Sequence, residues 1–286
     1  MNGSGGRVDL NSPREVKRFL NDRGISLKKR WGQNFLISEP WRRRIVDLAN
    51  VGPGERIWEV GPGIGSLTDG LLEAGADLTL FEIDHGLIAL LEERYGERVR
   101  IVPGDAVRSW QEESRENGPP KKVIGNLPYS SGARIIASFV ESDLPEPPPM
   151  VVMVQQEVAQ RMVATAGSSD YSSFTVLIAS CYNVKREGEV GPQAFFPQPR
   201  VRSSVLSLEP RGEPLSPVGR RGLSRIARGF FASRRKTIRN ALHRHFSEEE
   251  QRRLGDTLAA AGVRESRRGE ELPPELYEKL AHALLP

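Results

Sequence analysis

Apolar positions along the first half of the chain alternate between two kinds of spacing. Short apolar runs, each closed by glycine or a polar residue, predict strands at 56–60, 77–84, 99–102, 121–125 and 150–155. Leucines and other apolar residues three or four positions apart predict helices at 13–21, 66–74, 87–95 and 133–140. Strands that alternate with helices are typical of an α/β fold with a parallel, doubly wound sheet.

The second half of the chain has a different pattern. Two apolar runs, 174–184 and 201–208, have no helix of crossover length between them, so we expect an antiparallel pair at the sheet edge. Residues 211–222 are rich in Pro, Gly and Arg and are expected to form a linker. Only helical spacing follows, at 223–232, 234–245, 247–261 and 274–285. We therefore predict an N-terminal extension (1–27), a catalytic α/β domain (28–210) and a helical C-terminal domain (211–286).

Composition excludes several classes of protein. A hydrophobic share of 38% in 286 residues is enough to build a core and excludes wholesale disorder. There is no uncharged apolar stretch of about 18 residues, and the N-terminus lacks the apolar segment of a secretory signal. Cys181 is the single cysteine and there are four histidines, so we expect no disulfide scaffold and no metal site. We expect a cytoplasmic protein.

The formal net charge of +4 conceals a strong segregation of charge. Residues 14–44 hold 10 Lys/Arg against 3 Asp/Glu, and residues 200–246 hold 12 against 2. The segment between them, 45–199, holds 12 against 22. Basic segments are often solvated helix faces. However, 33 of the 41 basic residues are Arg, whose planar guanidinium suits phosphate, so we favour a nucleic-acid surface.

A glycine-rich loop follows the first predicted strand. Gly61, Gly63 and Gly65 are spaced as G-x-G-x-G, which permits either a tight strand–helix turn or a close backbone approach to a ligand. Glu82 ends the second strand, where a carboxylate is placed to accept ribose hydroxyls, and Asp105 follows the third strand. Asp105 alone could be an ordinary turn residue. Together these residues resemble the cofactor site of S-adenosylmethionine-dependent methyltransferases.

The fourth strand ends in Asn126-Leu127-Pro128-Tyr129, a tetrad similar to that of methyltransferases acting on exocyclic amines. The N6 lone pair of adenine is delocalised into the ring, so acceptors for the N6 hydrogens would make it a better nucleophile. The Asn126 side-chain oxygen and the Leu127 carbonyl could be these acceptors. Pro128 would stiffen the turn, and Tyr129 would offer a flat face to the base. The alternative is a simple strand-ending turn.

Several motifs occur together in a fixed order: KKRWGQNFLIS, WEVGPGIGSLT, FEID, IGNLPYS, MVQQEVAQRM, FFPQPRVRSSV and FFASRRKTIRNAL. From about Leu27 to Leu242 the chain resembles the ribosomal RNA adenine dimethyltransferases, in particular the bacterial small-subunit enzymes of the KsgA type. The resemblance implies a Rossmann-like methyltransferase fold with a mostly parallel seven-stranded sheet and a small all-α domain. It also implies dimethylation, at N6, of two adjacent adenosines in the 3′-terminal hairpin of 16S rRNA.

The resemblance also implies roles for individual residues. The cofactor, S-adenosyl-L-methionine, would be held by Asn34, Leu36, Gly61, Gly63, Gly65, Glu82, Asp105 and Asn126. Catalysis would rest on Asn126, Leu127, Pro128 and Tyr129, with Phe195 stacking on the base opposite Tyr129. Read from the sequence alone, Phe195 could equally be a hydrophobic plug.

The substrate is expected to be 16S rRNA in the 30S subunit or its precursor, bound by a monomer. The basic residues expected to hold its phosphates are Lys28, Lys29, Arg30, Arg225, Arg228, Arg234, Arg235, Lys236 and Arg239. One alternative is methylation of 23S rRNA. Another is a non-enzymatic role in ribosome assembly on the same scaffold.

Overall fold

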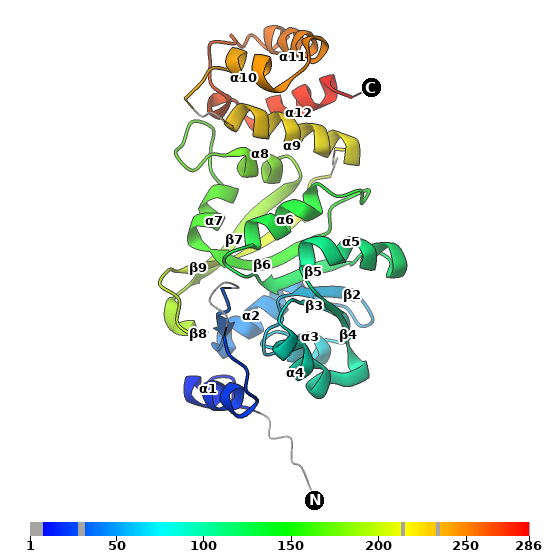
Figure 1. Cartoon of the computed structure of the whole chain (residues 1–286), viewed down its shortest axis with the longest axis vertical. Coiled ribbons are helices and arrows are strands. Elements are labelled where there is room, and N and C mark those ends of the chain that lie inside the picture. The colour runs from blue at the N-terminus through cyan, green and yellow to red at the C-terminus, as the bar shows by residue number, and fades with distance from the viewer. Residues whose placement is uncertain (1–7, 28–31, 213–214, 233–234, 286) are drawn as a thin grey trace, which may run out of the picture. The chain divides into compact units, whose positions relative to one another are not determined.

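The computed structural model describes residues 8–27, 32–212, 215–232 and 235–285. Its strands are β1 (Phe35–Leu36), β2 (Arg56–Val60), β3 (Asp77–Glu82), β4 (Arg100–Pro103), β5 (Lys122–Asn126), β6 (Met150–Gln155), β7 (Tyr182–Val190), β8 (Phe195–Phe196) and β9 (Ser203–Pro210). Seven of them form one sheet in the order β4-β3-β2-β5-β6-β9-β7, and β1 pairs with β8 in a second, two-stranded sheet (Figure 1).

The strand order confirms the expected mostly parallel, doubly wound α/β sheet. β2 pairs in parallel with β3 on one side and with β5 on the other. The chain therefore runs outward from β2 to β4, returns, and then runs outward from β5 to β6. The point where this direction reverses, between the carboxyl ends of β2 and β5, is where ligands bind in open α/β sheets.

The helices of the first half are α1 (Pro13–Asp22), α2 (Glu39–Ala49), α3 (Thr68–Glu73), α4 (His85–Tyr95), α5 (Ala106–Asn117), α6 (Gly132–Val140) and α7 (Gln156–Met162). Four of these were predicted, whereas α2, α5 and α7 were not. Short 3₁₀ turns of the described residues include η2 (Gly96–Arg98), η3 (Pro192–Ala194) and η4 (Gly269–Glu271).

The prediction for 174–184 was wrong in its first half. Residues Ser173–Ala179 form helix α8, and the strand β7 begins only at Tyr182. A capping box starts the helix, because the Ser172 hydroxyl accepts from the Thr175 N–H and the Thr175 hydroxyl accepts from the Ser172 N–H. The edge pairing itself is present: β9 lies beside β7, and the Arg211 N–H donates to the Cys181 carbonyl at 2.9 Å. The residue after β9 thus meets the residue before β7, as in an antiparallel pair.

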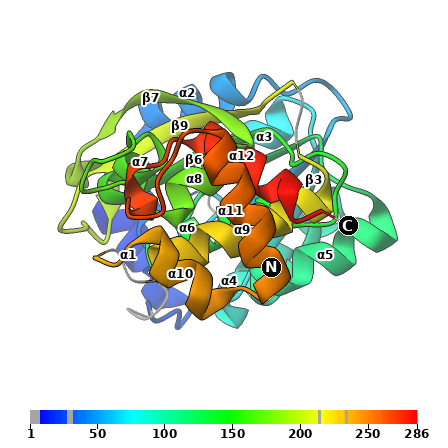
Figure 2. The same cartoon turned by 90° about the horizontal axis from the view of Figure 1, so that it is seen from above.

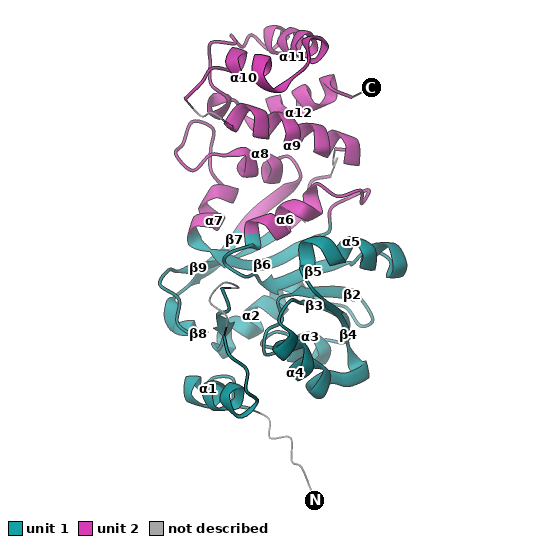
Figure 3. Ribbon diagram, in the orientation of Figure 1, with its two compact units in different colours: residues 1–132, 148–156, 186–207 teal, residues 133–147, 157–185, 208–286 magenta. Residues whose placement is uncertain are grey.

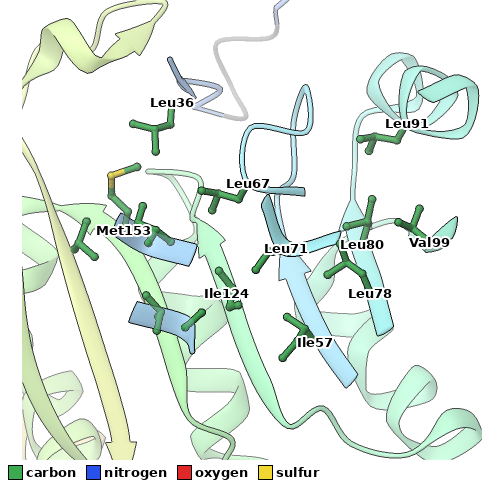
Figure 4. Close-up of a cluster of buried hydrophobic side chains, with 14 of the residues drawn as sticks. Leu36, Ile57, Leu67, Leu71, Leu78, Leu80, Leu91, Val99, Ile124 and Met153 are labelled. Carbon is green, nitrogen blue, oxygen red and sulfur yellow. The ribbon is translucent and has the colours of Figure 1, made fainter. Parts of the chain in front are cut away.

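A cluster of buried hydrophobic side chains lies around the central strands (Figure 4). Ile57, Leu80 and Ile124 from three neighbouring strands have no exposed surface and pack with Leu71 of α3. Leu36 of β1 and Phe195 of β8 belong to the same cluster. The small second sheet is therefore anchored to the core of the large one.

The chain divides into two compact units (Figure 3). Unit 1 comprises residues 1–132, 148–156 and 186–207, and unit 2 comprises residues 133–147, 157–185 and 208–286. The three predicted domains divide the chain differently, since segments 133–147 and 157–185 group with the C-terminal helices. These predicted domains remain a proposal about function.

Unit 2 contains the C-terminal helices α9 (Pro217–Phe231), α10 (Ile238–His245), α11 (Glu248–Ala260) and α12 (Pro274–Ala283) (Figures 1 and 2). α9 begins inside the predicted linker, because the Ser216 hydroxyl caps it and Pro217 opens its first turn. In the part of the chain that the structure describes, no helix is both long and apolar enough to cross a bilayer.

Candidate active site

The glycine loop after β2 adopts a backbone that other residues would strain. Gly61, Gly63 and Gly65 have φ values of 71°, 60° and 82°. A Cβ on Gly63 would lie 2.8 Å from two ring carbons of Phe35, and a Cβ on Gly61 would lie 3.4 Å from Cδ of Pro128. The loop is therefore held between β1 and the turn after β5 by contacts that only glycine allows.

Glu82 ends β3 beside this loop and is only 6% exposed. Its Oε1 accepts from the N–H groups of Ile83 (2.9 Å) and Asp84 (3.0 Å), and its Oε2 accepts from the Gly63 N–H (3.2 Å). Burial raises the pKa of Glu82 above its ordinary value, against the opposing effect of these three donors. A carboxylate has about four acceptor positions, so the backbone leaves about one for a ligand hydroxyl. The sequence suggested that both ribose hydroxyls would be accepted.

The Asn126–Tyr129 turn contacts the segment around β1. The Asn126 side-chain Nδ2 donates to the Asn34 carbonyl at 2.7 Å. The amide oxygen of Asn126 is thereby directed away from that carbonyl and can accept a hydrogen bond. A Cβ on Gly32 would lie 3.3 Å from the Tyr129 nitrogen. We call residues 32–36 the gate segment, because they lie against the tetrad as well as the glycine loop.

Within the tetrad, Tyr129 is half-buried and its hydroxyl lies 2.6 Å from the Ser203 hydroxyl at the start of β9. Burial raises the pKa of Tyr129, so its hydroxyl stays protonated. Leu127 is 1% exposed, and its N–H donates to the Met153 carbonyl at 3.0 Å. Pro128 packs on the glycine loop. The ring of Tyr129 is thus tethered at its far end.

Phe195 is brought to the gate segment by the small sheet. Leu36 pairs with Phe195 and Phe35 with Phe196, and the Ala194 carbonyl accepts from the Ile37 N–H at 2.8 Å. Phe195 is 2% exposed. Its ring could stack on a base only if the apolar side chains that cover it moved, so that role stays a prediction.

Two buried carboxylates that the site prediction omitted also belong here. Glu59 of β2 is 1% exposed and accepts from the Thr68 hydroxyl at 2.7 Å, and burial raises its pKa to about 8. Asp84, 3% exposed, caps α4 and accepts from Nε2 of Gln33 at 3.2 Å. Both carboxylates are part of recognised motifs, Glu59 of WEVGPG and Asp84 of FEID, and these motifs were the signal available in the sequence.

Asp105 serves as the N-cap of α5, since its Oδ1 accepts from the Val107 N–H at 3.1 Å. This is the turn role that the sequence left open. Contact with a cofactor through this carboxylate stays a prediction.

The basic residues predicted to bind RNA differ in their surroundings. Arg225, Arg228 and Arg239 are exposed but form ion pairs with Glu250, Glu141 and Glu265, respectively. Arg235 and Lys236 are exposed and form no ion pair with any described residue. Lys28, Lys29, Arg30 and Arg234 lie outside the described residues. Exposed ion pairs are weak, so a phosphate could displace the three carboxylates.

Comparison with known proteins bears on this site. The model of the family described as "Ribosomal RNA adenine dimethylase" matches residues 24–284. The "Ribosomal RNA small subunit methyltransferase A" of Alkaliphilus oremlandii is 37% identical over 281 residues, covering 96% of this chain and 98% of the relative. The protein of the same name from Treponema denticola is 36% identical over 238 residues, covering 82% of this chain and 81% of the relative.

Two solved structures share the fold. A dimethyladenosine transferase from Plasmodium falciparum superposes with a TM-score of 0.69 at 21% identity, covering 85% of this chain and 94% of that one. The 23S rRNA methyltransferase ErmE superposes with a TM-score of 0.60 at 26% identity, covering 88% and 99%. With the site geometry and the family match over most of its length, the chain belongs to the ribosomal RNA adenine dimethylase family.

Proposed function

We propose that this enzyme uses S-adenosyl-L-methionine to dimethylate N6 of two adjacent adenosines in the 3′-terminal hairpin of 16S rRNA. The observation that carries the proposal is the assembly of the Asn126–Tyr129 turn, the glycine loop and the gate segment around one switch point. The names of the curated relatives support the small subunit as the source of the RNA.

The residues around the switch point fit this cofactor. Gly61, Gly63 and Gly65 leave the loop without side chains that could fill the space next to it. Glu82 would accept one ribose hydroxyl through Oε2, and Asp105 would face the adenine. Asn34, Leu36 and Asn126 would close the site on the side of the gate segment. When bound, the cofactor supplies a methyl group on a positively charged sulfur.

The protein's contribution to methyl transfer would be positioning. The Asn126 amide is fixed by its bond to the Asn34 carbonyl, so its oxygen can accept one N6 hydrogen, while the Leu127 carbonyl accepts the other. Both bonds would localise the lone pair on N6 and orient it for in-line attack. Tyr129, tethered to Ser203, would hold the flipped base by stacking.

RNA binding is proposed for the predicted basic residues: Lys28, Lys29, Arg30, Arg225, Arg228, Arg234, Arg235, Lys236 and Arg239. Phosphates would replace the carboxylates now paired with Arg225, Arg228 and Arg239. We further propose that the protein acts as a monomer, in the cytoplasm, on the 30S subunit or its precursor.

A second candidate is methylation of 23S rRNA, which the similarity to ErmE favours. The relatives named for the small subunit are more similar, at 37% identity over 96% of this chain. We therefore place the small-subunit reaction first.

The test is methyl transfer from labelled cofactor to unmethylated 30S particles and, separately, to 23S RNA, with the modified base mapped by reverse transcription. We expect label at two adjacent adenosines of the 30S particle only. Label in 23S RNA alone would reverse the order of the candidates. Absence of label in both would leave a non-enzymatic assembly role.

The Asn126→Ala variant tests the mechanism in the same assay. It lacks the amide that contacts both Asn34 and N6, so transfer should fall by at least about a hundredfold, the usual cost of losing one such acceptor. Far-UV circular dichroism and urea unfolding report whether the variant still folds, and calorimetry reports separately whether it still binds the cofactor. A variant that binds cofactor and keeps normal turnover would refute the role of Asn126.

A further inference from the structure

Helix α1 carries a basic stripe on its outer face. Arg14, Lys17 and Arg18 are exposed, and Arg14 lies three positions before Lys17 and four before Arg18, so the three share one face of the helix. Asn21 continues the same stripe. The motifs that identify the family begin after this helix and assign it no role.

The opposite, apolar face of α1 is packed against other residues of unit 1. Val16 is 0% exposed and Leu20 is 2% exposed, and both pack with Phe35 of the gate segment and Ile64 of the glycine loop. Leu87 and Leu90 of α4 belong to the same cluster. A basic amphipathic helix can bind a membrane surface through its apolar face. Here that face is buried, so only the charged face is available to a partner.

Among the described residues, no carboxylate forms an ion pair with Arg14, Lys17 or Arg18. Most exposed arginines of the C-terminal helix α9, by contrast, have such partners: Arg221 pairs with Asp143, and Arg225 with Glu250. On α1 itself, Glu15 accepts from the Asp9 N–H at 3.2 Å, and Asp22, four positions after Arg18, forms no ion pair with it.

We propose that the Arg14–Lys17–Arg18 face of α1 binds the sugar–phosphate backbone of the RNA substrate, an inference that rests on the proposed function. Three cations that form no ion pair with a described residue, on a helix packed against unit 1, offer a polyanion site that needs no rearrangement of the ion pairs seen in the structure. In the sequence, the predicted RNA contacts Lys28, Lys29 and Arg30 follow α1 closely. RNA held there would lie on a helix whose other face touches Phe35 and Ile64.

The experiment compares the full-length chain with the variant Arg14→Gln/Lys17→Gln/Arg18→Gln. A matched control, Arg252→Gln/Arg264→Gln/Lys279→Gln, removes the same charge from exposed residues of unit 2 that also form no ion pair with described residues. Glutamine preserves helix propensity and no buried contact is touched. Affinity for unmethylated 30S particles is measured by filter binding from low to physiological salt.

Three phosphate contacts should contribute about −2 to −3 to the slope of log affinity against log salt. The advantage of the wild type over the α1 variant should therefore shrink roughly 30-fold when salt rises fourfold. The control should keep the wild-type slope, and all three proteins should bind the cofactor equally.

An α1 variant with the wild-type slope, or a control that loses as much as the α1 variant, would overturn the proposal. So would a variant that binds particles normally but has lost binding to vesicles of phosphatidylglycerol and phosphatidylcholine, since the partner would then be a membrane. Failure of the proposed function is a separate result: the wild type would then transfer no methyl group to 30S particles at all.

Discussion

Substituting Gly63 by alanine tests how closely the glycine loop and the gate segment are fitted. Gly63 has a φ of +60°, and a Cβ at this position would lie 2.8 Å from Cδ1 and Cε1 of Phe35. Carbon atoms in contact normally lie about 3.5–4.0 Å apart, so the ring would have to withdraw by roughly 1 Å. Phe35 is 5% exposed and is paired to Phe196 through β1, so it has little room to do so.

Two effects contribute to the loss of stability in Gly63→Ala. The left-handed backbone costs alanine about 1–2 kcal/mol, and overpacking a fixed aromatic ring costs about 1–3 kcal/mol more. We therefore expect Gly63→Ala to lower the free energy of unfolding by about 2–5 kcal/mol. If β1 moved to remove the clash between the new Cβ and Phe35, it would displace the Asn34 carbonyl that holds Asn126. Methyl transfer should therefore fall as well.

Urea unfolding followed by tryptophan fluorescence measures this cost, because all four tryptophans of the sequence lie in residues 31–110, within unit 1. Gly54→Ala is the control: Gly54 has a φ of +73° with no atom within 4 Å of its Cβ position, so it should lose only the backbone part. In a double-mutant cycle, Phe35→Leu should recover about 1–3 kcal/mol of the Gly63→Ala loss. Equal losses at Gly54 and Gly63, or a cycle with no coupling, would refute the steric reasoning.

Three other predictions concern polar groups. Arg220 is fully buried and donates to five backbone carbonyls, from Val140 to Leu215. Arg220→Met should therefore lower the free energy of unfolding, measured by thermal unfolding, by about 3–5 kcal/mol. A loss below about 1 kcal/mol would contradict this. Glu59 has its pKa raised from 4.5 to about 8, so between these values the folded protein holds a proton that the unfolded chain releases. Stability should therefore fall by about 1.4 kcal/mol per pH unit from pH 5 to pH 8, and Glu59→Gln should abolish this fall in urea titrations; a variant with the wild-type slope would be evidence against it. Tyr129→Phe keeps the ring but loses the 2.6 Å contact with Ser203, so its turnover should fall by less than about tenfold. Tyr129→Ala also loses the ring, so its turnover should fall much further. Equal turnover in the two variants would argue against stacking.

The sequence predicted the elements of the sheet that bear the site, because each strand is a short apolar run closed by a motif. It did not predict α2, whose 39–49 segment has three consecutive arginines among its apolar residues and packs against β6 and α3. It also mistook Phe174–Ala179 for a strand, since β-branched residues fill a segment whose helix is set by the Ser172 cap.

Within the candidate site, chemistry was easier to predict than contacts. The order of the motifs placed Gly61, Glu82 and Asn126 near one another, and the structure brings their elements together. The pairing of Arg225 and Arg228 with carboxylates was not foreseeable, because Glu250 and Glu141 are distant in the sequence. The local pattern of residues in the sequence does not predict which surface charges form ion pairs.

The pairing of β1 with β8 has a consequence for synthesis of the protein on the ribosome. Leu36 meets Phe195, about 160 residues later in the chain, so the gate segment gains its strand partner only near the end of the catalytic part. At roughly 5–20 residues per second, this delay is about 10–30 s. During that time the glycine loop and the tetrad have already emerged, but the segment that covers them has no partner strand. A nascent chain would therefore acquire its cofactor site late, after translation has passed Phe196.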